Sequence, residues 1–134
     1  GGLVTLFISN ESANEAAITQ QAQSNFALIA VTTIILAPVV EELFFRGIIF
    51  RSFSRYNVVL GMVVSSLFFG FVHIYQALLA GDVSQLYYLI QYGGMGLVLA
   101  WVYVIRRNIL SAIFVHLLNN AISMVILWIS FGLL

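Results

Sequence analysis

The sequence predicts an all-α protein, a polytopic transmembrane bundle of about four spanning helices preceded by an N-terminal interfacial helix. Of its 134 residues 62% are hydrophobic and 7% are charged, whereas a soluble domain carries roughly 25% charged residues. Its apolar runs are long enough to cross a hydrocarbon core of about 30 Å at about 1.5 Å per residue. Backbone polar groups in lipid must be hydrogen-bonded within each segment, so we expect helices.

The elements follow from the order of polar and apolar stretches. Residues 1–24 are mixed in polarity, which favours an exposed or interfacial helix after a short apolar start. Four apolar segments follow and are predicted to span the membrane: 26 to about 53, 58–79, 86–105 and 109 to about 129. No repeat divides them, so we expect a single domain, residues 1–134.

The arginines predict the orientation of these segments. Arg51 and Arg55 follow the first span, and Arg106 and Arg107 follow the third. Positive residues favour cytoplasmic connections, so these ends are expected to face the cytoplasm.

Composition excludes several classes of function. The chain has no cysteine, which excludes disulfides, thiolate metal sites and a cysteine nucleophile. It has no lysine, no net charge and no basic run, so we expect no nucleic-acid partner. We expect the chain to be surrounded by a lipid bilayer. Its start lacks the basic flank of a signal peptide, so none is predicted.

Three charged residues interrupt the first span. Glu42 and Arg46 are four residues apart and share a helix face, so they can neutralise each other. Glu41 points about 100° away and lacks that partner. Pro38 removes a backbone hydrogen bond just before the cluster and is expected to kink the helix. An ionised group near the bilayer centre costs at least about 2.5–3.5 kcal/mol. The cluster therefore favours a functional carboxylate over a purely structural ion pair.

Other polar side chains occur on the later spans. His73 lies in the second span and His116 in the fourth, and these are the only two histidines. Asn120 shares a helix face with His116. Either histidine alone would favour a packing role. Because ionisable groups in membrane helices face the bundle interior, we expect these side chains to meet Glu41.

Such a set has two chemical interpretations. A glutamate with a histidine can polarise water and take its proton, while a histidine and an asparagine can donate hydrogen bonds to an oxyanion. This combination suits hydrolysis of an amide. Alternatively, Glu41, His73 and His116 could hold zinc with an open fourth position, although no compact His-Glu-x-x-His motif is present. We favour catalysis without a metal or other cofactor.

Three short motifs resemble those of one family. "EELFFR" (41–46), "FGFVH" (69–73) and "HLLNN" (116–120) follow one another on successive spans. Together they resemble the CAAX protease and bacteriocin-processing family, also called Abi, which includes the type II CAAX prenyl endopeptidase. The resemblance gives Glu42 and Arg46 supporting roles. It also implies further helices upstream, so we expect this chain to be a catalytic core.

The resemblance further implies a mechanism and a class of substrate. Glu41 and His73 would activate water, and His116 and Asn120 would form the oxyanion site. The implied activity is intramembrane endopeptidase, and the implied substrate is a membrane-associated peptide or protein. A non-enzymatic role in bacteriocin immunity or partner binding is one alternative. A proton-linked carrier is another.

The predicted depths of these residues differ. At about 1.5 Å per residue, His116 should lie nearest the arginine-flanked side, Glu41 deeper and His73 deeper still. Helix tilt and the kink at Pro38 would have to bring the three side chains level. We also expect the small residues of "YGGMG" (92–96) to support close helix packing and the phenylalanines of "FFGF" (68–71) to lie in the core.

Overall fold

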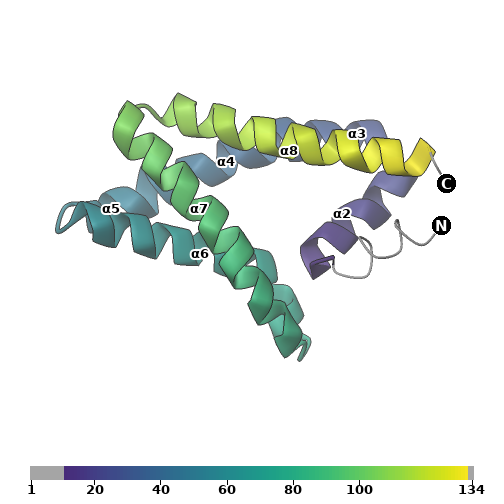
Figure 1. Ribbon diagram of the computed structural model, residues 1–134, viewed down its shortest axis with the longest axis horizontal. Coiled ribbons are helices and arrows are strands. Elements are labelled where there is room, and N and C mark those ends of the chain that lie inside the picture. The colour runs from purple at the N-terminus through teal and green to yellow at the C-terminus, as the bar shows by residue number, and fades with distance from the viewer. Residues whose placement is uncertain (1–10, 133–134) are drawn as a thin grey trace.

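The computed structural model describes residues 11–132, and each element within this range is a helix (Figure 1). The elements are α2 (Ala13–Ser24), α3 (Phe26–Val31), η1 (Thr32–Leu36), α4 (Ala37–Phe44), η2 (Phe45–Phe50), α5 (Arg51–Ser54), α6 (Val58–Leu79), η3 (Val83–Gln85), α7 (Leu86–Arg106) and α8 (Ile109–Gly132). The all-α class is confirmed. The predicted apolar start falls largely in residues 1–10, outside the described residues.

Four helical segments are long and apolar enough to cross a membrane, as predicted. They are Phe26–Ser54, Val58–Leu79, Val83–Arg106 and Ile109–Gly132. Asparagines begin three of them: the side-chain oxygens of Asn25, Asn57 and Asn108 accept backbone N–H groups two or three residues further on. These caps satisfy donors that the first turn of a helix leaves unpaired, which sets the start of each span.

The first span is interrupted by two π-helical segments, η1 and η2, on either side of α4. In η1 the Ala37 N–H bonds to the carbonyl of Thr32. With the same spacing, the carbonyl of Thr33 would pair with position 38, a proline that has no N–H. The disturbance expected at Pro38 is therefore a π-helical turn that leaves one carbonyl free. Such turns occur frequently at functional sites.

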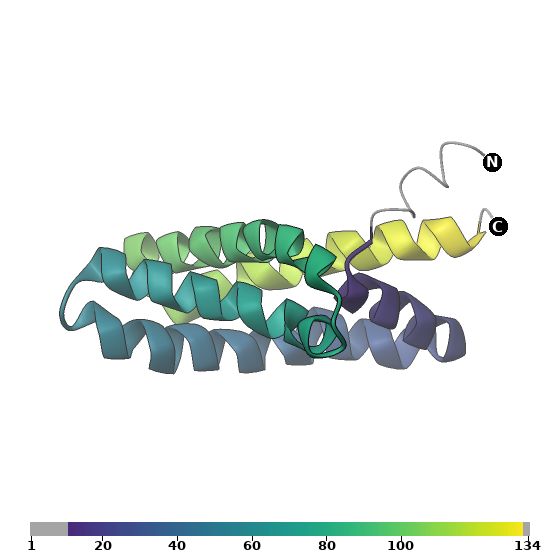
Figure 2. The same ribbon diagram turned by 90° about the horizontal axis from the view of Figure 1, so that it is seen from below.

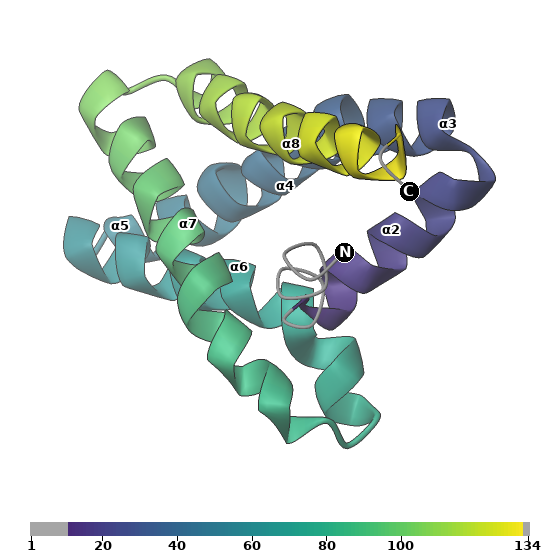
Figure 3. The ribbon, with the colours of Figure 1, turned by 45° about the vertical axis from the view of Figure 1, so that its right-hand side comes forward.

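The spans are arranged as two pairs. Helix α8 lies along the segment of α3 and α4, and α6 lies along α7 (Figures 1 and 3). The turn between α5 and α6 and the connection between α7 and α8 lie at the same end of the molecule (Figure 2). Helices α4, α6 and α8, which carry the three motifs, thus come together inside the bundle.

Polar and apolar residues are distributed as expected for a protein in lipid. Large apolar side chains on the spans are exposed, such as Leu79 and Ile90. In contrast Glu42, Arg46 and Ser65 are completely buried. The ion pair of the first span lies inside the bundle and apolar side chains cover the outside of the spans, which confirms a multi-pass membrane protein.

Glycines let α6 and α7 approach closely. A Cβ atom added to Gly70 would lie 2.9 Å from the backbone nitrogen of Gly93, and one added to Gly96 would lie 3.1 Å from the Cα of Ser66. Gly94 has no such neighbour within 4 Å. Two of the three glycines in "YGGMG" thus lie against α6, in agreement with the expected packing role.

Candidate active site

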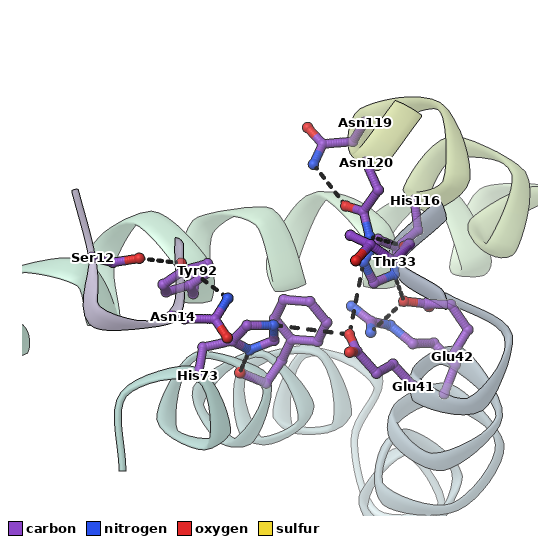
Figure 4. Close-up of polar contacts among 12 residues, drawn as sticks. Ser12, Asn14, Thr33, Glu41, Glu42, His73, Tyr92, His116, Asn119 and Asn120 are labelled. Atoms are coloured by element: carbon purple, nitrogen blue, oxygen red, sulfur yellow. Dashed lines mark hydrogen bonds and ion pairs between the residues drawn. The ribbon is translucent and has the colours of Figure 1, made fainter. Parts of the chain in front are cut away.

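Side chains from three spans meet at one carboxylate oxygen (Figure 4). Glu41 is on α4, His73 on α6 and His116 on α8. The Oε2 atom of Glu41 lies 3.9 Å from Nε2 of His73 and 3.7 Å from Nε2 of His116. The bundle therefore brings these residues together despite the different depths expected from the sequence.

This oxygen of Glu41 is buried and has no hydrogen-bond partner among the described residues. Both separations exceed the length of a direct hydrogen bond. A polar separation beyond 3.5 Å leaves open a contact through a water molecule. The Glu41 side chain as a whole is 28% exposed, so the site is accessible from outside the bundle.

A backbone hydrogen bond orients His73. Its Nδ1 lies 2.7 Å from the carbonyl oxygen of Phe69, one turn earlier on α6. A carbonyl oxygen only accepts, so Nδ1 carries the proton. In the neutral ring Nε2 is then an acceptor, and it faces Glu41.

Glu42 connects the first motif to the third. Its Oε1 accepts a hydrogen bond of 3.0 Å from Arg46, as the i, i+4 spacing predicted. The same oxygen lies 2.9 Å from Nδ1 of His116. Arg46 also donates to the carbonyl of Gly96, at 2.5 Å. Glu42 and Arg46 are fully buried, so each needs the other's charge to offset the cost of leaving water.

The aromatic ring of Phe69 packs against three residues of the site. It is 1% exposed, and its centroid lies 4.6 Å from that of His73 and 5.6 Å from that of His116. The guanidinium carbon of Arg46 lies 5.3 Å from the same centroid, a distance suited to a cation–π interaction. The sequence placed all three phenylalanines of "FFGF" in the core, which is correct for Phe69 but wrong for Phe68 and Phe71, which are exposed on the outside of α6. The contact of Phe69 with both histidines was not predicted.

Asn120 has different partners from those expected. Its amide nitrogen donates to the free carbonyl of Thr33 at 2.9 Å, and its oxygen accepts from Asn119 at 3.3 Å (Figure 4). None of its side-chain hydrogen bonds goes to Glu41 or to either histidine. Since an amide group has two N–H donors, one remains beyond the bond to Thr33. Sequence reasoning missed Thr33, although Pro38 signalled that a carbonyl would be left free.

The alternative metal set, Glu41, His73 and His116, stays a prediction. Among residues 11–132, no group of three histidine, aspartate or glutamate side chains is arranged as a metal site. We therefore derive no step through a metal.

The three motifs lie within a segment that matches a known family. Residues 23–122 match the family described as Type II CAAX prenyl endopeptidase Rce1-like. The chain belongs to this family. The Rce1-like segment includes Glu41, His73, His116 and Asn120, and it ends just beyond the third motif.

A relative in Bacillus subtilis strain 168 is similar over most of the chain. It is named "Putative membrane peptidase YdiL" and is 33% identical over 114 residues, which are 84% of this Rce1-like chain. The chain spans only 42% of that relative's length. No solved structure matches the chain.

Proposed function

We propose that this chain is the catalytic part of an intramembrane endopeptidase that hydrolyses a peptide bond of a membrane-associated peptide or protein. The observation that carries the proposal is the position of Glu41 Oε2 between the Nε2 atoms of His73 and His116, at 3.9 and 3.7 Å. Burying a carboxylate oxygen without a hydrogen-bond partner among apolar helices costs free energy. Such a group is therefore expected at a functional site. Membership of the Rce1-like family supports the same activity.

In the proposed reaction, Glu41 and His73 activate a water molecule. One hydrogen of the water is accepted by Glu41 Oε2 and the other by His73 Nε2, which directs an oxygen lone pair at the scissile carbonyl. Glu41 takes a proton as the water oxygen bonds to the carbonyl carbon. When the carbon–nitrogen bond breaks, the same proton passes to the leaving amine. No covalent enzyme intermediate is needed.

His116 and Asn120 are proposed to stabilise the oxyanion. Nδ1 of His116 donates to Glu42, so Nε2 carries a proton only in the imidazolium form. Donation to the oxyanion therefore requires that form. Asn120 would contribute the N–H that does not bond to Thr33. Donors held in place before the reaction stabilise the developing charge without reorganisation.

The experiment measures cleavage of a library of lipid-anchored peptides, prenylated and unprenylated, by the full-length protein in lipid. Wild type is compared with Glu41→Gln, and Glu11→Gln is the control because it is the same change outside the spans. Cleavage by wild type and Glu11→Gln but not by Glu41→Gln supports the proposal.

The same assay with a chelator tests whether a metal ion is needed. Loss of cleavage that added zinc restores would contradict the metal-free mechanism. If wild type cleaves nothing, the alternatives are bacteriocin immunity, partner binding or proton-linked transport.

A further inference from the structure

Resting on the proposed function, we propose that Tyr92 is a positioning residue for His73 and that the start of α2 holds Tyr92 in place. The rings of His73 and Tyr92 are stacked, with centroids 4.5 Å apart and planes inclined by 20°. Tyr92 comes from α7, which carries none of the three motifs. Figure 4 shows it beside His73, on the side away from Glu41.

The stacking adds to the restraint that the backbone hydrogen bond of His73 places on rotation of the imidazole ring. The bond from Nδ1 to Phe69 holds one atom of the imidazole. The torsion between Cβ and the ring is intrinsically broad. A turn about that bond would move Nε2 away from Glu41. A parallel ring at 4.5 Å opposes that turn, because the imidazole could rotate only by losing the contact or pushing Tyr92 aside.

Tyr92 is itself fixed by hydrogen bonds from α2. Its hydroxyl lies 2.5 Å from Oγ of Ser12, and it accepts from the amide of Asn14 at 3.4 Å. Ser12 is completely buried, and its Oγ also caps α2 by accepting from the N–H of Glu15. The position of Tyr92 is thus linked to the first turn of α2.

A second contact fixes the same turn to α7. The backbone N–H of Ala13 donates to Oε1 of Gln85 at 2.9 Å. Gln85 and Tyr92 are seven residues apart, so they lie on the same face of the helical segment. This turn precedes residues 23–122, the segment that matches the family. The hydrogen bonds that hold Tyr92 therefore come from residues outside that segment.

The proposal predicts different effects for different changes at Tyr92. Tyr92→Leu removes the ring and should lower kcat on the order of tenfold to a hundredfold with little change in KM, because misplaced catalytic groups slow the chemical step. Tyr92→Phe keeps the ring and loses only the hydroxyl, so a smaller loss is expected. Ser12→Ala should lower kcat about as much as Tyr92→Phe, because both changes remove the same hydrogen bond. The double variant Ser12→Ala/Tyr92→Phe should therefore have no lower kcat than the single variants. Tyr87→Leu is the matched control, an exposed tyrosine on the same helix.

The experiment combines these rates with the imidazole NMR signals of the full-length protein in lipid nanodiscs. His73 signals are identified from their loss in His73→Gln. A change in the ring-current shift of His73 that Tyr92→Leu produces and Tyr92→Phe does not, together with the expected fall in kcat, supports the proposal. Unchanged His73 signals, or wild-type kcat in Tyr92→Leu, would overturn it while leaving the endopeptidase intact. If wild type cleaves no peptide, the proposed function fails. In that case the NMR signals still test whether Tyr92 orients His73, but a role for Tyr92 in catalysis is overturned.

Discussion

Both histidines use one ring nitrogen for a structural contact and present the other to Glu41. Nδ1 of His73 donates to the Phe69 carbonyl, and Nδ1 of His116 donates to Glu42. The two structural acceptors differ, a neutral carbonyl and a carboxylate. In the proposed mechanism His73 therefore accepts a hydrogen bond from water through Nε2, whereas His116 donates to the oxyanion through Nε2. The two imidazoles are thus proposed to have different roles around the same oxygen.

The buried ion pair gives a stability prediction. Arg46→Met should lower the free energy of unfolding by about 3–5 kcal/mol, because it leaves Glu42 buried without its cation. Arg106→Met is the matched control at an exposed helix end and should change it by less than about 0.5 kcal/mol. Denaturation in mixed micelles, followed by circular dichroism, measures both. Equal losses in the two variants would show that the pair contributes nothing specific.

For individual residues, contacts within one helix could be predicted from the sequence, whereas contacts between helices could not. The pairing of Glu42 with Arg46 follows from their spacing on one helix, and so does the absence of an Arg46 hydrogen bond to Glu41. The bond from Asn120 to Thr33 depends on how α8 lies against the first span, which spacing does not determine. Roles for His116 and Asn120 at an oxyanion stay predictions.

At the scale of the helices, the first span shows how a local defect helps build the site. The π-helical turn before Pro38 exposes a carbonyl that Asn120 binds, which attaches α8 to the first span near Glu41. The second π segment, η2, begins at Phe45 and includes Arg46. Glu41 and Glu42 thus lie on a short α-helical segment between two irregular ones. Hydrophobic periodicity did not reveal these segments, since one extra residue per turn hardly alters an apolar run. Span limits were predictable because polar caps mark them.

Close packing of α6 on α7 gives a second prediction. Gly70→Ala should lower the thermal unfolding midpoint, because a Cβ 2.9 Å from the backbone of Gly93 forces the helices apart. Overpacking of this kind costs about 1–3 kcal/mol. Gly94→Ala, the same change on α7, meets nothing within 4 Å and should leave the midpoint unchanged or raise it, since alanine favours helix by about 1 kcal/mol. Thermal unfolding of both variants in the same detergent is the measurement. A lower midpoint for Gly94→Ala than for Gly70→Ala would contradict the packing described here.

At the scale of the whole molecule, the distribution of charge defines both topology and site. The turn between α5 and α6 and the connection between α7 and α8 share one end of the bundle, and arginines flank both (Figure 2). Asp82 lies in the turn at the opposite end of α6. The arginines occur at alternate connections along the sequence, and these connections lie at the same end of the folded molecule. Composition was sufficient to predict this arrangement, because lipid requires helices and positive residues favour one side.

Cysteine labelling tests the orientation, and the chain has no cysteine of its own. Tyr56→Cys lies in the turn after α5 and Val83→Cys at the first residue of η3, and both positions are well exposed. The positive-inside rule predicts that a membrane-impermeant maleimide added to intact cells labels Val83→Cys and spares Tyr56→Cys. Both should react once the membrane is permeabilised. The reverse pattern in intact cells would invert the topology.

The proposed reaction depends most on Glu41 as the base that activates water. The measurement that tests it most directly is the single-turnover rate of cleavage of one identified peptide by full-length Glu41→Gln, relative to wild type and Glu11→Gln. We predict a loss on the order of a hundredfold to ten-thousandfold for Glu41→Gln, the usual contribution of a general base, with peptide binding retained. Glu11→Gln should cleave at the wild-type rate. Cleavage by a folded, peptide-binding Glu41→Gln at the wild-type rate would contradict the central claim.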